Sequence, residues 1–209
     1  MLTKYPKTPH LPWSPGLKND DTLFEHLHAL HGKQVVVTEK MDGENTTLYR
    51  DGIHARSLDS RHHASRDWIK AAHGAIKNGI PDRWRVCGEN LYAQHSITYE
   101  ELPSYFMVFN VWDDTNVCLN WEQTCNWAEL LGFPTVPVLY QGVWDPQAIK
   151  TEWISRPGNT EGYVVRVAES FHFRDFRKNV AKYVRANHIQ TDEHWMAKPV
   201  VPNGIKQGP

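Results

Sequence analysis

The sequence predicts an α+β fold of mainly antiparallel sheets flanked by helices. Two observations lead to this class: strand-like runs outnumber helix-like runs, and turn residues such as Asp51-Gly52 join neighbouring strand-like runs into hairpins. A chain of 209 residues can bury one sizeable core. We divide it into an N-terminal arm and helix (1–32), a central domain (33–188), and a short C-terminal helix and tail (189–209).

The first part of the chain is expected to pass from an extended arm through a helix into strands. Four prolines within residues 1–15 exclude a helix there. Capping residues and an apolar stripe then predict a helix from about residue 21 to His31. Strands follow over 33–40, 44–50 and 53–58, separated by Asp-Gly turns.

The remaining elements follow from the same rules. Ser65 caps an expected helix to about Lys77, and Asn120 with Gln123 resembles the capping box of a helix to Leu131. Further strands are expected over 83–89, interrupted at Gly88-Glu89-Asn90, and over 105–112, 161–167 and 180–185. The tail from residue 198 is rich in proline and glycine and is expected to be loose.

Composition limits the cellular setting and the partners. The formal net charge of −1 gives no global attraction for nucleic acid, so such binding needs a local basic patch. Three cysteines favour neither a disulfide framework nor a zinc knuckle and indicate a reducing compartment. No apolar run reaches membrane-spanning length, and the first residues lack an apolar leader. We therefore expect a cytoplasmic protein with no membrane partner.

The stretch Thr38-Glu39-Lys40-Met41-Asp42-Gly43-Glu44-Asn45 admits two interpretations. It can be a β-hairpin with a charged tip, because Asp-Gly pairs favour tight reversals. It can instead present Lys40 as a nucleophile beside a nucleotide, with Gly43 allowing backbone and phosphate to approach closely. A lysine amine attacks only when neutral, so the second interpretation predicts that burial or nearby positive charge lowers the pKa of Lys40.

Five further stretches follow this one in order. They are Ala55-Arg56-Ser57, Cys87-Gly88-Glu89-Asn90, Phe106-Met107-Val108-Phe109-Asn110, Glu161-Gly162-Tyr163-Val164-Val165 and Val180-Ala181-Lys182-Tyr183-Val184-Arg185. The set resembles the covalent nucleotidyltransferase superfamily of ATP-dependent polynucleotide ligases and mRNA capping enzymes. Within it, the chain looks most like the RNA ligases of the bacteriophage T4 RNA ligase 2 type, because Asn45 stands where DNA ligases and capping enzymes usually carry arginine.

The resemblance implies a nucleotidyltransferase domain and an ATP-dependent RNA ligase. Lys40 would take AMP from ATP with Mg²⁺ (or Mn²⁺), AMP would pass to an RNA 5′-phosphate, and a 3′-hydroxyl would displace it. The implied partner is RNA with 5′-phosphate and 3′-hydroxyl ends, prepared where needed by an end-processing kinase or phosphatase, and we expect a monomer. Two alternatives stay open: a ligase sealing DNA or mixed RNA/DNA nicks, and a non-catalytic module that binds nucleotides or RNA ends.

The resemblance also assigns roles to single residues. Lys40 is the nucleophile, and Glu161 is the strand carboxylate near the lysine and the metal. Arg56 would hold the ribose or the incoming 5′-phosphate, Glu89 a ribose hydroxyl, and Lys182 the phosphate. Phe109 would stack on adenine. The other implied nucleotide-binding residues are Glu39, Asp42, Asn45 and Arg185. Taken singly, Phe109 would be interpreted as core and the charged residues as solvated surface.

The last stretch departs from the family pattern, which usually has two lysines two residues apart. Val184 stands at that spacing from Lys182, so either one cation suffices or Arg185 or Lys178 substitutes; we favour Lys182, with Arg185 second. The chain ends soon afterwards, so we expect no OB-fold domain.

Three other features carry weaker predictions. His62-His63 and the group His172, His188 and His194 lack cysteine companions, so we expect ordinary histidines and no zinc site. Trp195 is expected to pack in the tail. A candidate patch for the RNA backbone consists of Arg61, His62, His63, Arg66 and Lys70.

Overall fold

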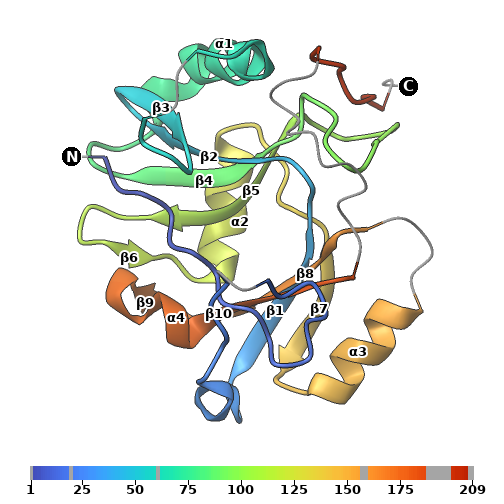
Figure 1. Ribbon diagram of the computed structural model, residues 1–209. Coiled ribbons are helices and arrows are strands. Elements are labelled where there is room, and N and C mark those ends of the chain that lie inside the picture. The colour runs from blue at the N-terminus through green and yellow to red at the C-terminus, as the bar shows by residue number, and fades with distance from the viewer. Residues whose placement is uncertain (1, 19–20, 60–61, 156–159, 187–198, 207–209) are drawn as a thin grey trace.

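The computed structural model describes residues 2–18, 21–59, 62–155, 160–186 and 199–206. Its strands form two antiparallel sheets, one above the other in the view of Figure 1. The four-stranded sheet has the order β10-β8-β1-β7 and consists of β1 (Gln34–Lys40), β7 (Val138–Val143), β8 (Gly162–Val167) and β10 (Val180–Val184). The six-stranded sheet has the order β3-β2-β4-β5-β6-β9 and consists of β2 (Glu44–Tyr49), β3 (Gly52–Ala55), β4 (Arg85–Asn90), β5 (Phe106–Trp112), β6 (Val117–Cys118) and β9 (Phe171–His172). The predicted α+β class with antiparallel sheets is confirmed.

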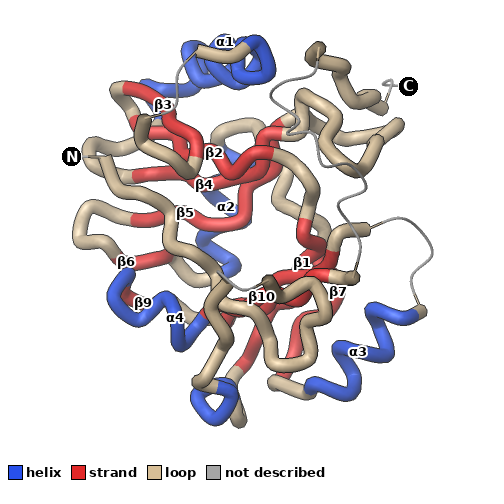
Figure 2. The backbone as a smooth tube through the Cα atoms, viewed as in Figure 1, coloured by secondary structure: helices blue, strands red, loops and turns tan. Residues whose placement is uncertain are grey.

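Helices lie around these sheets (Figure 2). The α-helices are α1 (Asp67–Ile76), α2 (Trp121–Leu130), α3 (Pro146–Ile154) and α4 (Phe176–Asn179). The 3-10 helices are η1 (Leu27–Leu30), η2 (Ala64–Arg66), η3 (Lys77–Gly79) and η4 (Phe173–Asp175). Among the described residues, no helix combines the length and the apolar character that crossing a membrane requires.

The β1 strand is buried on both faces. Val35 and Val37 belong to one apolar cluster with Tyr163 of β8, whereas Val36 belongs to another cluster with Met41. Successive side chains of a strand point to opposite faces, so three consecutive valines supply two parts of the core. This burial fixes β1 as a central strand, and its last residues, Thr38-Glu39-Lys40, reach the gap between the sheets.

The connection between β1 and β2 is not a hairpin, and the hairpin interpretation is wrong. β1 pairs with β7 and β8, whereas β2 pairs with β3 and β4 in the other sheet. The residues between them therefore carry the chain from one sheet to the next. Gly43 lies so close to β4 that an added Cβ would stand 2.6 Å from the carbonyl oxygen of Asn90. Glycine is thus required here by the close approach of two backbones.

Most of the other predicted elements are present. The Asp51-Gly52 hairpin joins β2 and β3, and the helices expected over 65–77 and 120–131 correspond to η2-α1 and α2. The Asn120 side chain caps α2, accepting a hydrogen bond from the Gln123 N–H at 2.8 Å. β4 is not interrupted at residues 88–90: it continues to Asn90, with a change of register between Cys87 and Gly88.

Two predictions at the ends of the chain are wrong. The helix expected from about residue 21 to His31 is reduced to η1, because residues 22–24 pair with the N-terminal arm: the His10 N–H donates to the Thr22 carbonyl, and the Phe24 N–H donates to the His10 carbonyl. The tail is not loose over 199–206, because the Asn203 side chain is buried against the 91–105 loop. The expected helix after residue 189, Trp195, His188 and His194 lie outside the described residues.

Candidate active site

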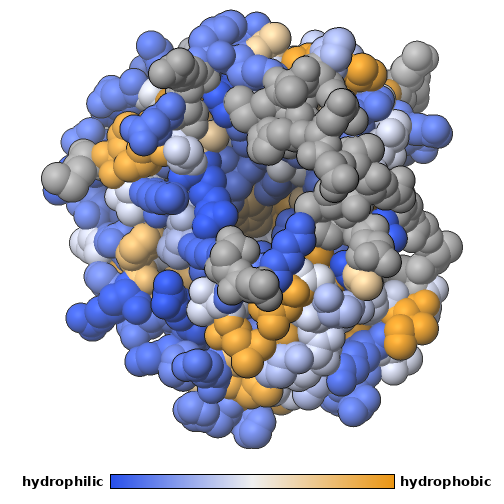
Figure 3. All heavy atoms as spheres, in the orientation of Figure 1, coloured by the Kyte–Doolittle hydropathy of each residue, from blue (hydrophilic) through white to orange (hydrophobic). Residues whose placement is uncertain are grey.

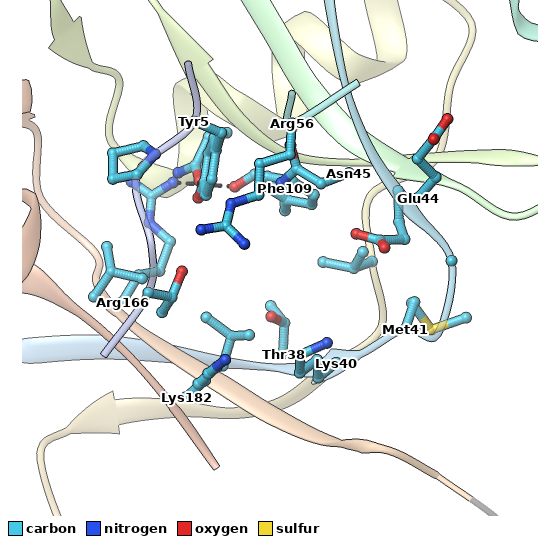
Figure 4. A pocket seen from close by; sticks show the side chains of 18 of the residues that line it. Tyr5, Thr38, Lys40, Met41, Glu44, Asn45, Arg56, Phe109, Arg166 and Lys182 are labelled. Atoms are coloured by element: carbon cyan, nitrogen blue, oxygen red, sulfur yellow. Dashed lines mark hydrogen bonds between the residues drawn. The ribbon is translucent and has the colours of Figure 1, made fainter. Parts of the chain in front are cut away.

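A cavity of about 540 Å³ opens between the two sheets. Its lower wall in Figure 4 carries Thr38, Lys40 and Lys182, and its upper wall carries Asn45, Arg56 and Phe109. A hollow edged largely by hydrophilic residues is visible near the middle of the space-filling view (Figure 3). The predicted residues that line the cavity are Glu39, Lys40, Asn45, Arg56, Glu89, Phe109 and Lys182.

Strand register places Lys40 beside Glu161. Lys40 at the end of β1 pairs with Gly162 at the start of β8, so the residue preceding Gly162 lies next to the lysine. The Nζ of Lys40 donates to Oε2 of Glu161 at 2.6 Å. Glu161 is buried, whereas the side chain of Lys40 keeps 24% of its surface exposed toward the cavity. An amine and a carboxylate that lie 121 residues apart in the sequence therefore form an ion pair.

The pKa of Lys40 is raised, and the expectation of a lowered pKa is wrong for the ligand-free protein. Burial acts to lower the pKa of Lys40, but the carboxylates of Glu161, Glu89 and Asp42 outweigh burial. The ammonium form is therefore the resting state.

Two neighbouring groups have shifted pKa values in the directions that burial dictates. Burial raises the pKa of Glu89 to about 8, with Glu161 and Asp42 acting in the same direction. Burial and the positive charge of Lys40 lower the pKa of Lys182. The cavity thus contains a carboxyl group that titrates near neutral pH and a cation that sheds its proton more readily than usual.

The upper wall combines an aromatic ring with polar groups. Phe109 on β5 is half-buried, and its ring packs edge-to-face on Tyr5 at a centroid distance of 5.4 Å. Asn45 and Glu89 are cross-strand partners on β2 and β4. The Oδ1 atom of Asn45 is buried without a hydrogen-bond partner, so it can accept a hydrogen bond from a ligand.

Besides Glu161, which is paired with the lining residue Lys40, two predicted binding residues do not line the cavity. Asp42 is buried and holds the 91–105 loop: its Oδ2 accepts from the Ile97 N–H at 2.8 Å, and its own N–H donates to the Tyr99 hydroxyl at 2.9 Å. Arg185 follows β10 and donates its backbone N–H to the Glu161 carbonyl at 3.0 Å. Lys178, the other suggested substitute, is exposed and lies 3.4 Å from Asp175. Lys182 is thus the cavity cation of the last motif.

Sequence reasoning missed several lining residues. Arg166 of β8 lines the cavity and donates to the Leu119 carbonyl at 2.7 Å; strand alternation from Val164, which also lines it, could have found this residue. The N-terminal arm contributes Tyr5, Pro6, Lys7 and Thr8, for which the sequence carries no local signal.

The candidate patch for the RNA backbone is not one exposed basic surface. Arg66 is buried and lines the cavity. Its guanidinium forms an ion pair with the carboxylate of Glu44, and Nε donates to Oε2 at 2.6 Å. His62 is exposed and lies 3.1 Å from Asp67, and His63 caps η2. Lys70 is exposed, and Arg61 lies outside the described residues.

Comparison with solved structures indicates the fold. The chain superposes on the Naegleria gruberi RNA ligase with PPi at a TM-score of 0.59 and 20% identity, covering 88% of this chain and 58% of that one. A mutant of that ligase with ATP and Mn gives a TM-score of 0.57 at 17% identity, with coverages of 88% and 60%. An archaeal ATP-dependent RNA ligase gives 0.55 at 15% identity, with coverages of 88% and 48%. At such identities the likeness concerns the fold, and the chain spans about half to three fifths of these ligases.

Sequence comparison adds the family. No curated protein matches the chain. The family model described as RNA ligase matches residues 33–184, which is more than half of the chain and includes every strand from β1 to β10. The chain belongs to the RNA ligase family.

Proposed function

We propose that this protein is an ATP-dependent RNA ligase of the bacteriophage T4 RNA ligase 2 type that becomes adenylylated on Lys40. The observation that carries the proposal is the Lys40–Glu161 pair, which places a lysine amine 2.6 Å from a buried carboxylate at the wall of a cavity of nucleotide size. The opposite wall offers an aromatic ring at Phe109 and a hydrogen-bond acceptor at Asn45, which suit a base and its sugar.

The first step requires a free amine. Lys40 rests as an ammonium ion because its pKa is raised, so a proton must leave before attack. Oε2 of Glu161 is the acceptor within hydrogen-bond distance, and it would pass the proton on to solvent. The Nζ lone pair then forms a bond to the α-phosphorus of ATP while the bond to pyrophosphate breaks, which leaves AMP on the lysine. Lys182 on β10, which β8 separates from β1, balances the phosphate charge.

The residues around Lys40 suit a divalent cation that is shared with the substrate. Carboxylate oxygens are the ligands Mg²⁺ prefers; Glu161 provides them beside Lys40, and Glu89 provides them on the cavity wall. The described residues contain no group of three histidine, cysteine or acidic side chains able to hold a metal by themselves, so phosphate oxygens would complete the shell. When bound, Mg²⁺ or Mn²⁺ would neutralise phosphate charge.

RNA enters in the later steps. AMP passes from Lys40 to the 5′-phosphate of one RNA end, and the 3′-hydroxyl of the other end attacks that phosphate and releases AMP. Arg56 and Ser57 are exposed where β3 leaves the six-stranded sheet, and both line the cavity. They suit contacts to an incoming strand, since guanidinium groups bind phosphates well.

Labelling tests the proposal directly. The purified protein is incubated with Mg²⁺ and ATP labelled at the α-phosphate, next to Lys40→Ala and the matched control Lys33→Ala, whose lysine does not line the cavity. We expect an acid-labile label on the wild type and on the control, located on Lys40 by mass spectrometry, and none on Lys40→Ala.

The substrate needs a second assay. Sealing of all-RNA ends should exceed sealing of all-DNA nicks. Sealing of DNA alone would instead support the DNA ligase, and an unlabelled wild type would support a binding module without catalysis.

A further inference from the structure

The N-terminal arm, residues 2–18, belongs to the cavity although it precedes the residues that the family model matches. In Figure 1 the arm (dark blue) runs across the front of the molecule from the six-stranded sheet toward β10. Its residues Tyr5, Pro6, Lys7 and Thr8 line the cavity between the sheets. The arm is therefore a wall of the candidate active site, and Lys7 is its one charged lining residue among those described.

Two sets of contacts fix the position of the arm. At one end, the Tyr5 hydroxyl donates to Oδ1 of Asn110 at 2.6 Å, and the Tyr5 ring packs edge-to-face on Phe109. At the other end, the Lys182 N–H donates to the Pro9 carbonyl at 2.8 Å, and the Leu11 N–H donates to the Lys182 carbonyl at 2.7 Å. Lys7 lies between these anchors, so its backbone is held beside β10.

Lys7 and Lys182 share one carboxylate. The Nζ of Lys7 lies 3.4 Å from Oδ1 of Asp21, and the Nζ of Lys182 lies 4.0 Å from the same oxygen. Asp21 itself does not line the cavity. It therefore orients two ammonium groups from outside, and both stand at the cavity within reach of one phosphate group or of two successive phosphates.

The other cations of the cavity, apart from Lys40 with its partner Glu161, are bound to groups other than Asp21 or lie on another wall. Arg66 is bound by Glu44, and Arg166 donates to the backbone carbonyls of Val167, Phe109 and Leu119. Arg56 stands on the opposite wall (Figure 4). The position two residues after Lys182 is Val184, which offers no charge. Among the residues that the structure describes, Lys7 is thus the cation placed to act together with Lys182.

We propose that Lys7 binds phosphate beside Lys182 and supplies, from the N-terminal arm, the second positive charge of the phosphate site. This inference rests on the proposed function. A polyphosphate carries several negative charges in a small volume, and two ammonium groups on adjacent backbone segments match it better than one. The phosphate can belong to ATP or to the 5′ end of RNA, and the experiment separates the two.

The first part of the experiment measures ATP. Lys7→Gln keeps the length of the side chain and removes its charge, Lys7→Arg restores the charge, and Lys4→Gln is the matched control because Lys4 is exposed on the same arm and does not line the cavity. Each substitution is combined with Lys40→Ala, so that ATP binds without reacting, and ATP affinity is measured by calorimetry. We expect Lys7→Gln to weaken binding about tenfold or more, Lys7→Arg to recover most of it, and Lys4→Gln to match the parent.

The second part measures RNA. The same Lys7 and Lys4 substitutions, with Lys40 intact, are assayed for sealing of RNA that already carries AMP on its 5′-phosphate, which bypasses ATP. A raised KM for this RNA in Lys7→Gln, restored by Lys7→Arg, would assign Lys7 to the RNA 5′-phosphate, whereas a loss confined to ATP affinity would assign it to the polyphosphate. Thermal unfolding of Lys7→Gln should match the parent.

The outcomes distinguish the two proposals. A wild type that never forms lysyl-AMP would overturn the proposed function, yet the ATP affinities would still decide the role of Lys7. A wild type that forms lysyl-AMP and seals RNA, together with a Lys7→Gln variant that equals it in both parts, would overturn the inference alone. A loss in Lys7→Gln that Lys7→Arg does not repair would also overturn it, because charge would then be irrelevant.

Discussion

Lys40 and Glu161 form a single ion pair across the β1–β8 register, with 2.6 Å between Nζ and Oε2. The carboxylate is the first group that opposes burial in setting the pKa of Lys40. Glu161→Gln keeps the shape and removes this charge, so the pKa of Lys40 should fall. Because the proton acceptor is lost as well, lysyl-AMP formation should drop about 100-fold or more. Single-turnover labelling checks this, with unfolding by urea as the control for an intact fold; an unchanged rate would contradict it.

The rate of lysyl-AMP formation should rise with pH. The pKa of Lys40 is raised by its acidic neighbours against the effect of burial, so only a small fraction of the amine is free near neutral pH. Each unit of pH should then increase the free amine, and with it the rate, about tenfold until another step limits. Rapid-quench measurements at saturating ATP from about pH 6 to 8 provide the check. A rate that does not vary over this range would show that another group or step controls the reaction.

The parts of the site that lie within single strands could be predicted from sequence. Lys40 stands on β1, Glu161 directly before β8 and Lys182 on β10, and the pairing of these three strands brings them together. Each motif marks a strand or its end, so recognising the motifs amounted to recognising the strands. A motif does not reveal which charged groups surround it in the fold. The predicted direction of the Lys40 pKa shift was therefore wrong.

The parts that depend on contacts between distant segments could not be predicted. The hydrogen bonds of residues 22–24 go to the N-terminal arm, so a good local helix signal was overridden. The local sequence around Asn203 indicates a turn, yet its side chain is buried against the 91–105 loop, about a hundred residues earlier in the chain. For α3, in contrast, a local signal was present and overlooked: Asp145 caps the helix and Pro146 begins it.

Gly162→Ala should disrupt the four-stranded sheet. A Cβ at this position would stand 1.9 Å from the carbonyl oxygen of Tyr183, which belongs to the backbone of β10 and cannot rotate away. β8 and β10 would have to separate, which would move Glu161 and Lys182 apart. We expect a loss of about 2 kcal/mol or more in the free energy of unfolding. Gly52→Ala is the matched control, since a Cβ there meets nothing within 4 Å. Equal stability of the two variants in urea would contradict the prediction.

His10 should make the fold sensitive to mild acid. Burial, with the positive charge of Lys182, lowers the pKa of His10 to about 4, although Asp21 acts in the opposite direction. Between about pH 6.5 and 4 the unfolded chain binds a proton that the folded chain refuses, so stability falls as the pH falls. Acidification from pH 7.5 to 5 should therefore lower the free energy of unfolding by roughly 2 kcal/mol through His10.

Urea unfolding of wild type and His10→Gln at these two pH values isolates the contribution of His10. The wild type should lose more stability on acidification than the variant does, by the amount given above. His62→Gln, at an exposed histidine, should behave as the wild type. Parallel losses in the wild type and in His10→Gln would show that His10 is not the group responsible.

Asn203 should hold the loop behind the Asp42-Gly43 turn. Its side chain accepts from the Tyr99 N–H at 2.8 Å and donates to the Leu91 carbonyl at 2.7 Å, and the Tyr99 hydroxyl in turn accepts the Asp42 N–H. Asn203→Ala leaves buried backbone groups without partners, which should cost about 1–3 kcal/mol of unfolding free energy. Because Asp42 follows Lys40 by two residues, slower adenylylation should accompany the loss.

Lys206→Ala, an exposed change three residues along the same segment, is the control for Asn203. It should alter neither stability nor rate, because the contact of Lys206 with the loop is made by its backbone N–H to the Leu102 carbonyl. Hydrogen exchange of the Asp42 and Ile97 amides should quicken in Asn203→Ala only. Unchanged exchange at both amides would mean that the tail packs on the loop without stabilising the turn that follows Lys40.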